Sequence, residues 1–439
     1  MNLIFYTEKL NPRIEYIVKH LFTRVLSYTV EFTSDQNYFI ASDKVCIQYG
    51  SQRINTASFF IPIHRFILEN DIRPQDITFS NIDPLPTLFP VSQLEADLSF
   101  DFLSMAFYLL SRYEEYLPFE DDEHGRFAAS QSQAFKHNFL YQPLVDQWLM
   151  LINEQLSERF QFTRIKSNVY AYIPTIDVDF GWAYLYKGSW RTLGAALKDL
   201  VKGQFGNLAT RLAVLRGKQA DPYFTFDYLN RLHKASASEA CYFFLFGEYG
   251  PYDKNTSPEH PAMQQLVQKV ALENNIGIHP SYASNLDVNL LAKEKNKLAT
   301  VSGQTINISR QHFLKLSLPD TYRHLLSVGI QADYSMGYAE ALGFRASTCH
   351  PYSWYDLERE QETELTIFPF QIMDVTLKNY LGLSPKTAIE PCQKMIEEVR
   401  AVNGTLISIW HNSSFSPLMG WDGWQAMYES FVELAGGRE

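Results

Sequence analysis

The stretch "YAYIPTIDVDF", residues 170–180, is an apolar, strand-like run that ends at two carboxylates, Asp177 and Asp179. Alternate side chains of an extended chain share one face, so both acids can point into one cavity. Two close carboxylates ionise together only at a cost, which a divalent cation beside them would remove. The alternative is that an aspartate here caps the N-terminus of a following helix. The pair therefore predicts either a metal-assisted active site or a helix cap.

The same pattern recurs along residues 166–439, where short apolar runs lead into polar residues and helix-like segments separate them. Strands that alternate with helices indicate βα units and a mostly parallel sheet or barrel. In such folds the active site gathers at the C-terminal ends of the strands, so this half is predicted to be an enzyme domain. The eight runs are "VYAYIPTID", "ACYFFLFGEYG", "NIGIHPSYAS", "INISRQHF", "GIQADYS", "LGFRAST", "TIFPFQIMD" and "TLISIWHN".

Residues 1–165 have the features of a second, smaller α/β unit. Strands are predicted at "NLIFYT" and "KVCIQYG", and apolar residues at helical spacing predict a helix over "RIEYIVKHLFTRVL". The polar clusters "SRYEEY" and "DDEHGRF" are either a solvated helix end and turn, or a docking surface for the second half. The length of 439 residues favours two domains, which we expect at 1–165 and 166–439.

Composition excludes several classes of protein. With 38 basic and 49 acidic residues, the net charge of −11 argues against a general nucleic-acid binder. Aromatic residues make up 15% of the chain, which suits either core packing or a sugar-facing cleft. The four cysteines lie far apart and form no CxxC pair, so we expect free thiols in a reducing compartment. No signal peptide or spanning helix is predicted, so the expected location is cytoplasmic, and the oligomeric state stays open.

Residues 187–218 differ in charge from the rest of the chain. They contain seven basic residues and one acidic residue, a net charge of +6, together with an apolar helical face. A basic amphipathic helix can lie on an anionic membrane surface. The alternative is a solvated helical insertion over the mouth of the barrel, and the sequence leaves both interpretations open.

Polar residues at the predicted strand ends supply the parts of a hydrolytic site. A neutral imidazole is the commonest transition-metal ligand, although a lone histidine can also be structural. An arginine orients a nearby carboxylate, and an aspartate fixes the tautomer of a histidine. Metal-assisted hydrolysis of an acyl bond requires such a set, whereas the chain has neither a GxSxG elbow nor a P-loop. The residues are His279, Arg310, His312, Arg345, Asp374 and His411.

The motifs "TIDVD", "GIHPSY", "GFRAST", "MD" and "IWH", in this order, resemble the five motifs of the polysaccharide deacetylase family. This is carbohydrate esterase family four, with its NodB-like domain, and the resemblance covers about residues 166–439. It implies a distorted (β/α) barrel with fewer than eight full repeats and a metal-dependent hydrolase, with zinc as the expected metal. The implied substrate is an N-acetylated sugar of a polysaccharide or glycan precursor. The N-terminal half resembles an uncharacterised domain that accompanies such domains in Bacteroidetes-like proteins.

The resemblance also implies roles for single residues. Asp177 would be the general base, oriented by Arg345, while Asp179 and His279 would bind the metal. Of the last two motifs, Asp374 would support His411, which would protonate the leaving amine. We further expect Arg310 and Trp410, the neighbours of these strand ends, to contact the substrate.

Three departures from the family pattern bear on the metal site. One residue separates the two acids, Ala346 and Ser347 replace the usual proline of the third motif, and Ala283 stands where a second metal histidine is typical. A catalytic zinc normally has three protein ligands, so we expect His312 to be the third. Two alternatives remain: a catalytically decayed relative that binds glycan, and an amidohydrolase of small non-peptide C–N bonds.

Overall fold

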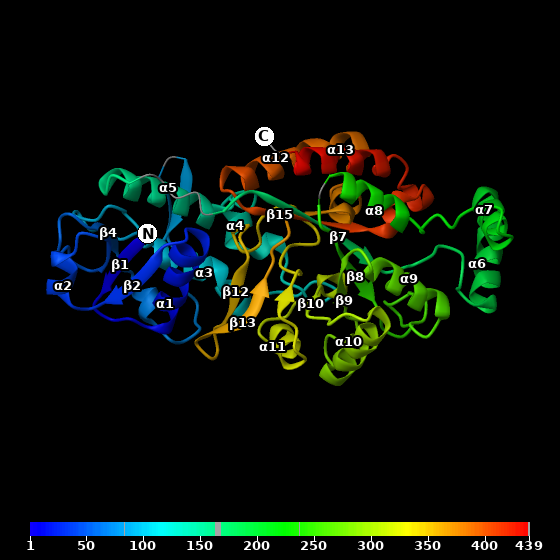
Figure 1. Cartoon of the computed structure of the whole chain (residues 1–439), viewed down its shortest axis with the longest axis horizontal. Helices are drawn as coiled ribbons and strands as arrows, with labels where there is room; N and C mark the ends of the chain where they lie inside the picture. The colour runs from blue at the N-terminus through cyan, green and yellow to red at the C-terminus, as the bar shows by residue number, and fades with distance from the viewer. Residues whose placement is uncertain (83, 163–167, 237, 438–439) are drawn as a thin grey trace.

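The structure, a computed structural model, describes residues 1–82, 84–162, 168–236 and 238–437 (Figure 1). The N-terminal half contains a four-stranded parallel sheet in the order β2-β1-β3-β4. Its strands are β1 (Asn2–Thr7), β2 (Thr29–Thr33), β3 (Val45–Gly50) and β4 (Phe59–Pro62). A two-stranded ribbon of β5 (Phe79–Ile82) and β6 (Leu85–Leu88) accompanies it. The two strands predicted in this half are therefore present as β1 and β3.

Helices of the N-terminal half pack against this small sheet and contribute apolar side chains to its core. The helix predicted over residues 13–26 forms as α1 followed by a π-helical stretch, Lys19–Val25. Pro12 opens α1, where its missing N–H has no helical partner to lose, and the Asn11 side chain caps the helix by accepting from the Ile14 N–H. The α-helices are α1 (Pro12–Val18), α2 (Gln36–Ala41), α3 (Phe102–Leu110), α4 (Gln133–Lys136) and α5 (Leu144–Arg159).

A curled nine-stranded sheet forms the centre of the C-terminal half, in the order β12-β13-β11-β10-β9-β8-β7-β15-β14. All neighbouring strands are parallel except β12 and β13. The strands are β7 (Ala171–Val178), β8 (Cys241–Leu245), β9 (Asn275–His279), β10 (Ile308–Ser309), β11 (Ala332–Asp333), β12 (Tyr352–Asp356), β13 (Gln361–Ile367), β14 (Ile372–Met373) and β15 (Thr405–His411). The fold class is thus an α/β half-barrel of this curled type, preceded by an extra α/β region, as predicted.

One predicted strand does not form. The run "LGFRAST", residues 342–348, is loop, and the antiparallel hairpin of β12 and β13 follows it. The loop lies against the N-terminal half, where the Phe344 N–H donates to the Leu140 carbonyl and the Val145 N–H to the Ser347 carbonyl. These backbone partners replace the sheet partners that the run would have needed as a strand.

Helices cover the curled sheet, with α12 and α13 on one side of the strands and α10 and α11 on the other (Figure 1). They are α8 (Phe226–Ala235), α9 (Pro261–Ala271), α10 (Val288–Ser302), α11 (Asp320–Ser327), α12 (Pro385–Ala401) and α13 (Trp424–Gly436). Two more helices, α6 (Ser189–Val201) and α7 (Phe205–Leu215), form a hairpin that stands away from the body. Among the described residues, no helix is long and apolar enough to cross a membrane.

The two halves share one apolar core and several buried polar contacts. A single cluster of buried side chains runs from Leu3 to Ala435 and draws on both halves. The clusters "SRYEEY" and "DDEHGRF" both contact the second half, because Glu115 binds Arg345 and Arg126 donates to the Phe313 carbonyl. The docking interpretation of these clusters therefore fits the structure. The predicted boundary between residues 165 and 166 lies outside the described residues.

Candidate active site

The strand-end residues line one cavity of about 200 Å³. Its polar lining comes from the ends of β7, β9 and β15, from the turn after β10, and from the N-terminal half. Parallel strands deliver their C-terminal ends to the same edge of a sheet, which explains why residues far apart in sequence meet there. The polar lining residues used below are Arg126, Asp177, Asp179, His279, His312 and His411.

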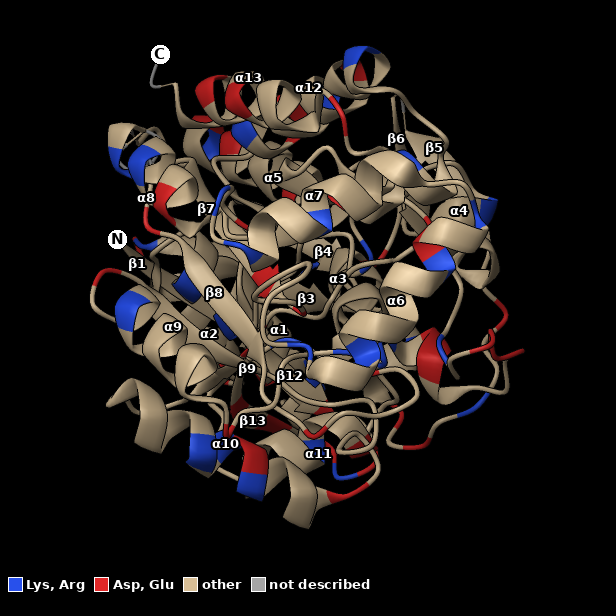
Figure 2. Ribbon diagram, turned by 90° about the vertical axis from the view of Figure 1, so that its right-hand side faces the viewer, with Lys and Arg blue, Asp and Glu red and all other residues tan. Residues whose placement is uncertain are grey.

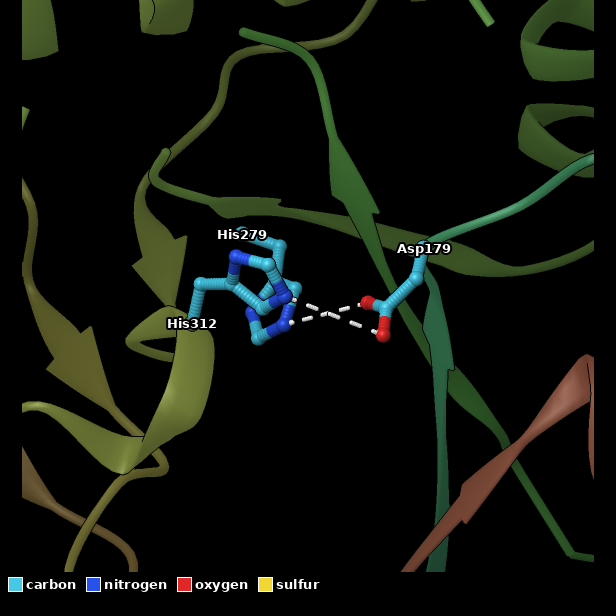
Figure 3. Close-up of side chains that lie close together, drawn as sticks. All are labelled: Asp179, His279 and His312. Carbon is cyan, nitrogen blue, oxygen red and sulfur yellow. Dashed lines mark ion pairs between the residues drawn. The ribbon is translucent and has the colours of Figure 1, made fainter. Parts of the chain in front are cut away.

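Asp179, His279 and His312 form a compact group whose ligand atoms all lie within 4.8 Å of one another (Figure 3). His279 Nε2 is 3.4 Å from Asp179 Oδ1, and His312 Nε2 is 3.8 Å from Asp179 Oδ2. These are the three residues predicted as ligands. His312 thus lies where a third donor is needed, since Ala283 offers none.

Hydrogen bonds fix how both imidazoles face Asp179. His279 Nδ1 is 2.6 Å from the Arg310 carbonyl oxygen, and His312 Nδ1 is 2.8 Å from Asp253 Oδ1. Both partners are acceptors, so each Nδ1 donates to its partner and each Nε2 faces Asp179, where it becomes a metal ligand once it carries no proton. Partners of this kind typically orient metal-bound histidines.

The residues present fit a divalent metal. Burial raises the pKa of Asp179, but His312, His279 and His411 outweigh burial and hold that pKa well below its usual value. Asp179 Oδ1 is buried and makes no hydrogen bond, so the oxygen is free for a cation. Two imidazole nitrogens and a carboxylate are a donor set that zinc accepts in catalytic sites. The identity of the metal is a prediction.

Asp177 is bound by Arg310. This contact corrects the expected substrate contact of Arg310 and the expected orientation of Asp177 by Arg345. Arg310 Nη1 donates to Asp177 Oδ1 at 2.8 Å and to the Thr175 hydroxyl at 2.7 Å. The Arg310 side chain is fully buried, so it cannot contact the substrate as predicted. Arg345, predicted to orient Asp177, instead donates to Glu115 Oε1 and Oε2 at 2.9 and 2.6 Å. Residue 345 lies in the loop that packs on the N-terminal half, which turns its guanidinium away from the cavity.

His411 and Asp374 form the predicted pair. His411 Nδ1 lies 2.9 Å from Asp374 Oδ1, and the Ser414 hydroxyl donates to Asp374 Oδ2 at 2.5 Å. Burial lowers the pKa of His411, but Asp374, together with Asp179 and Asp177, outweighs burial and raises it to about 10. His411 Nε2 faces Asp179 Oδ2 at 3.8 Å, so a protonated imidazole borders the cavity.

Trp410 does not reach the cavity. Its side chain is fully buried and packs against Phe415, Tyr428 and Phe431, on the side of the sheet covered by α13. Neighbouring side chains of a strand point to opposite faces, so the residue beside His411 must point away from the site. The predicted substrate contact of Trp410 is therefore wrong, and strand alternation alone could have excluded it.

Several residues of the site were missed by the sequence analysis, among them Asp253 and Arg126. Asp253, which orients His312, comes from the loop after β8 and belongs to no recognisable motif. Arg126, from the "DDEHGRF" cluster, lines the cavity from the N-terminal half, with its Nε bonded to Asp122 at 2.7 Å. Only its position in a polar cluster could have indicated it.

One family model matches the N-terminal part of the chain. Residues 3–161 match the model of a family of unknown function (DUF7033). Among proteins with curated descriptions, none matches the chain.

Solved structures of deacetylases are similar to part of the chain. A protein from Mycobacterium smegmatis, described as a polysaccharide deacetylase, is 15% identical with a TM-score of 0.41, covering 63% of this chain and 87% of its own. A polysaccharide deacetylase from Bacillus cereus is 12% identical with a TM-score of 0.30, covering 61% and 86%. A peptidoglycan N-acetylglucosamine deacetylase is 13% identical with a TM-score of 0.29, covering 62% and 91%. The order and pairing of the chain's own strands define the fold described above.

Proposed function

We propose that the chain is a metal-dependent hydrolase that removes acetyl groups from N-acetylated sugars of a polysaccharide or glycan precursor. The observation that carries the proposal is the convergence of three parts on one cavity: the group Asp179, His279 and His312, the carboxylate Asp177, and the His411–Asp374 pair. Hydrolysis of an amide needs an electrophilic centre, a proton acceptor and a proton donor, and these parts supply all three.

Asp179, His279 and His312 would hold the metal. A divalent metal in this position supplies a Lewis acid toward the acetamide carbonyl and promotes the ionisation of water. The hydrogen bonds from His279 to the Arg310 carbonyl and from His312 to Asp253 reduce the reorganisation needed when the metal enters. Burial raises the pKa of Asp179, but the neighbouring histidines outweigh it and keep this carboxylate charged at the ligand position.

Asp177 is suited to accept a proton from the attacking water. Arg310 occupies its Oδ1, which leaves Oδ2 toward the cavity, 3.9 Å from His279 Nε2. The fixed guanidinium keeps this carboxylate in one orientation, and a positioned base contributes about 10²–10⁴-fold to such reactions.

His411 is suited to donate a proton to the departing amine. With a pKa of about 10 it carries that proton at neutral pH. Water adds to the acetamide carbon, the C–N bond breaks, and the nitrogen takes the His411 proton while Asp177 holds the proton from water. Acetate and the free amino sugar leave together, and Asp374 stabilises the imidazolium before transfer.

The test is acetate release from N-acetylglucosamine oligomers. We expect the metal-loaded protein to release acetate, and we expect chelation and the His411→Ala variant to abolish release. Activity that survives both changes would reject the mechanism. Metal-dependent turnover of small cyclic amides, without acetate release from the oligomers, would favour the amidohydrolase alternative instead.

Metal content tests the ligand set independently of activity. The His312→Ala variant is expected to lose bound zinc in elemental analysis, because only Asp179 and His279 remain. His324→Ala is a matched control, since His324 lies on α11 outside the group. Unchanged zinc in His312→Ala would remove His312 from the site.

A further inference from the structure

The hairpin of α6 and α7 exposes an unusual amount of apolar surface. Trp190 and Val201 are each 86% exposed, and Phe205 is 65% exposed. On α6 the exposed apolar residues recur three or four positions apart, so they form one continuous stripe along the helix. The members of this stripe are Trp190, Leu193, Leu197, Leu200 and Val201. On α7, Phe205, Leu212 and Leu215 are also exposed.

Basic residues flank the stripe. Lys198 and Lys202 are spaced four positions apart, so they share a second face of α6, beside the apolar one. The only acid between residues 187 and 218, Asp199, is turned toward α7, where Arg211 donates to its Oδ2 at 2.8 Å. The outer surface of the hairpin is thus apolar and cationic, in a chain with a net charge of −11. Figure 2 looks onto this side and shows both helices in front.

The hairpin is fixed to the body at its base. Lys187 lies over the Phe180 ring, with Nζ 4.9 Å from its centroid, and the Arg191 guanidinium lies 4.1 Å from the Tyr249 centroid. Arg191 also donates to the Lys254 carbonyl at 3.2 Å, next to Asp253, which orients His312. The exposed stripe therefore belongs to a positioned element that is connected to the loop around the site.

We infer that the outer face of the α6–α7 hairpin docks on an anionic lipid surface. Such a surface has an anionic layer over an apolar interior, and it complements a stripe of apolar residues flanked by lysine and arginine. At 13 residues, α6 is too short to span a bilayer, so it would lie in the plane of the interface. Tryptophan at one end of the stripe is the side chain most favoured at that depth. The inference does not depend on the proposed hydrolase activity.

Trp190 provides a direct measurement in the full-length protein. The chain has seven tryptophans, and the other six are at most 9% exposed. Iodide therefore quenches mainly Trp190 in solution. Vesicles of phosphatidylcholine with phosphatidylglycerol are expected to protect it from iodide and shift its emission to the blue, while phosphatidylcholine vesicles alone leave both unchanged.

Two sets of variants separate the apolar and the charged contributions. The apolar variant is Trp190→Ser/Val201→Ser/Phe205→Ser. Its affinity for the anionic vesicles, measured by co-sedimentation, is expected to fall roughly a hundredfold or more. Lys198→Gln/Lys202→Gln is expected to reduce it about thirtyfold, at about 1 kcal/mol per charge. The matched controls remove exposed residues elsewhere, with Leu94→Ser/Leu272→Ser and Lys136→Gln/Lys386→Gln, and should bind as the wild type does.

Several outcomes would overturn the inference. These are equal binding to neutral and anionic vesicles, equal binding by the hairpin variants and the wild type, or unchanged iodide quenching of Trp190 on vesicles. A concentration-dependent dimer that the serine variant abolishes, without vesicle binding, would show that a second copy of the chain covers the face. Should the serine variant fail to fold, the quenching of wild-type Trp190 still decides the question.

Discussion

Two of the buried arginine–carboxylate pairs in this molecule serve different purposes. Arg310 binds Asp177 at 2.8 Å, and Arg345 binds Glu115 at 2.6 Å, with all four side chains no more than 4% exposed. Glu115 has both oxygens bonded by Arg345 and accepts from Arg112 as well. Asp177 keeps one oxygen toward the cavity. A buried ion pair is therefore a candidate for chemistry only where the carboxylate retains an unbonded oxygen.

The largest expected effect comes from removing the charge of Asp177, with Glu115 as the comparison. Asp177→Asn is expected to lower acetate release per folded molecule by about 10²–10⁴-fold, because the proton acceptor is lost. Glu115→Gln removes a charge of equal burial and should leave turnover of the folded protein nearly unchanged. Acetate release normalised to the folded fraction measures both, and a larger loss in Glu115→Gln would invert the comparison.

The Glu115–Arg345 pair should instead affect the free energy of unfolding. Arg345→Met leaves the Glu115 carboxylate without one of its two arginines, and breaking such a buried pair costs about 3–5 kcal/mol. Urea unfolding measures this loss. Zinc content of the folded variant should equal that of the wild type, because Arg345 contacts neither the ligands nor Asp177 among the contacts of the described residues. Loss of zinc at full stability would contradict the assignment.

Asp253 is a third buried carboxylate, and its partner is a histidine, His312, instead of an arginine. Asp253→Asn is expected to weaken zinc affinity about 10–100-fold, since the amide no longer holds the His312 tautomer as firmly. The measurement is a competition titration with a chelator of known affinity. Asp356→Asn is the control, because Asp356 is also buried but binds Arg323 at 2.8 Å, outside the site. Equal affinities of the two variants would leave Asp253 without a role.

The smallest effect is a pH dependence of metal binding. Burial lowers the pKa of His312, but Asp179 and Asp253 outweigh it and raise the pKa to about 9. Below that pH the metal must displace a proton, so zinc affinity should rise about tenfold per pH unit up to about pH 9 and then level off. Titrations of zinc at several pH values test this. An affinity independent of pH in the wild type would show that His312 binds no metal.

Much of the fold and the ligand group could be predicted from the sequence because both follow local rules. Apolar runs alternating with helices gave the βα pattern, and parallel strands bring their last residues to one edge. Asp179, His279 and His312 each lie at or just after a strand, so their meeting follows from topology.

The rest depends on contacts between distant residues. Arg310 and Arg345 both follow apolar runs, and no local pattern tells which of them reaches Asp177. Glu115, the partner of Arg345, lies 230 positions away along the chain. The composition of residues 342–348 suits a strand, and only their backbone hydrogen bonds to the N-terminal half show that they form a loop.

The Glu115–Arg345 contact also bears on inheritance. Arg345 of the curled sheet domain is neutralised by Glu115, a residue of the N-terminal half. Recombination that joined this domain to an unrelated N-terminal region would bury a guanidinium without a counter-charge, at a cost of several kcal/mol. We therefore expect domain shuffling to transmit the two halves together, or to replace Arg345 at the same time.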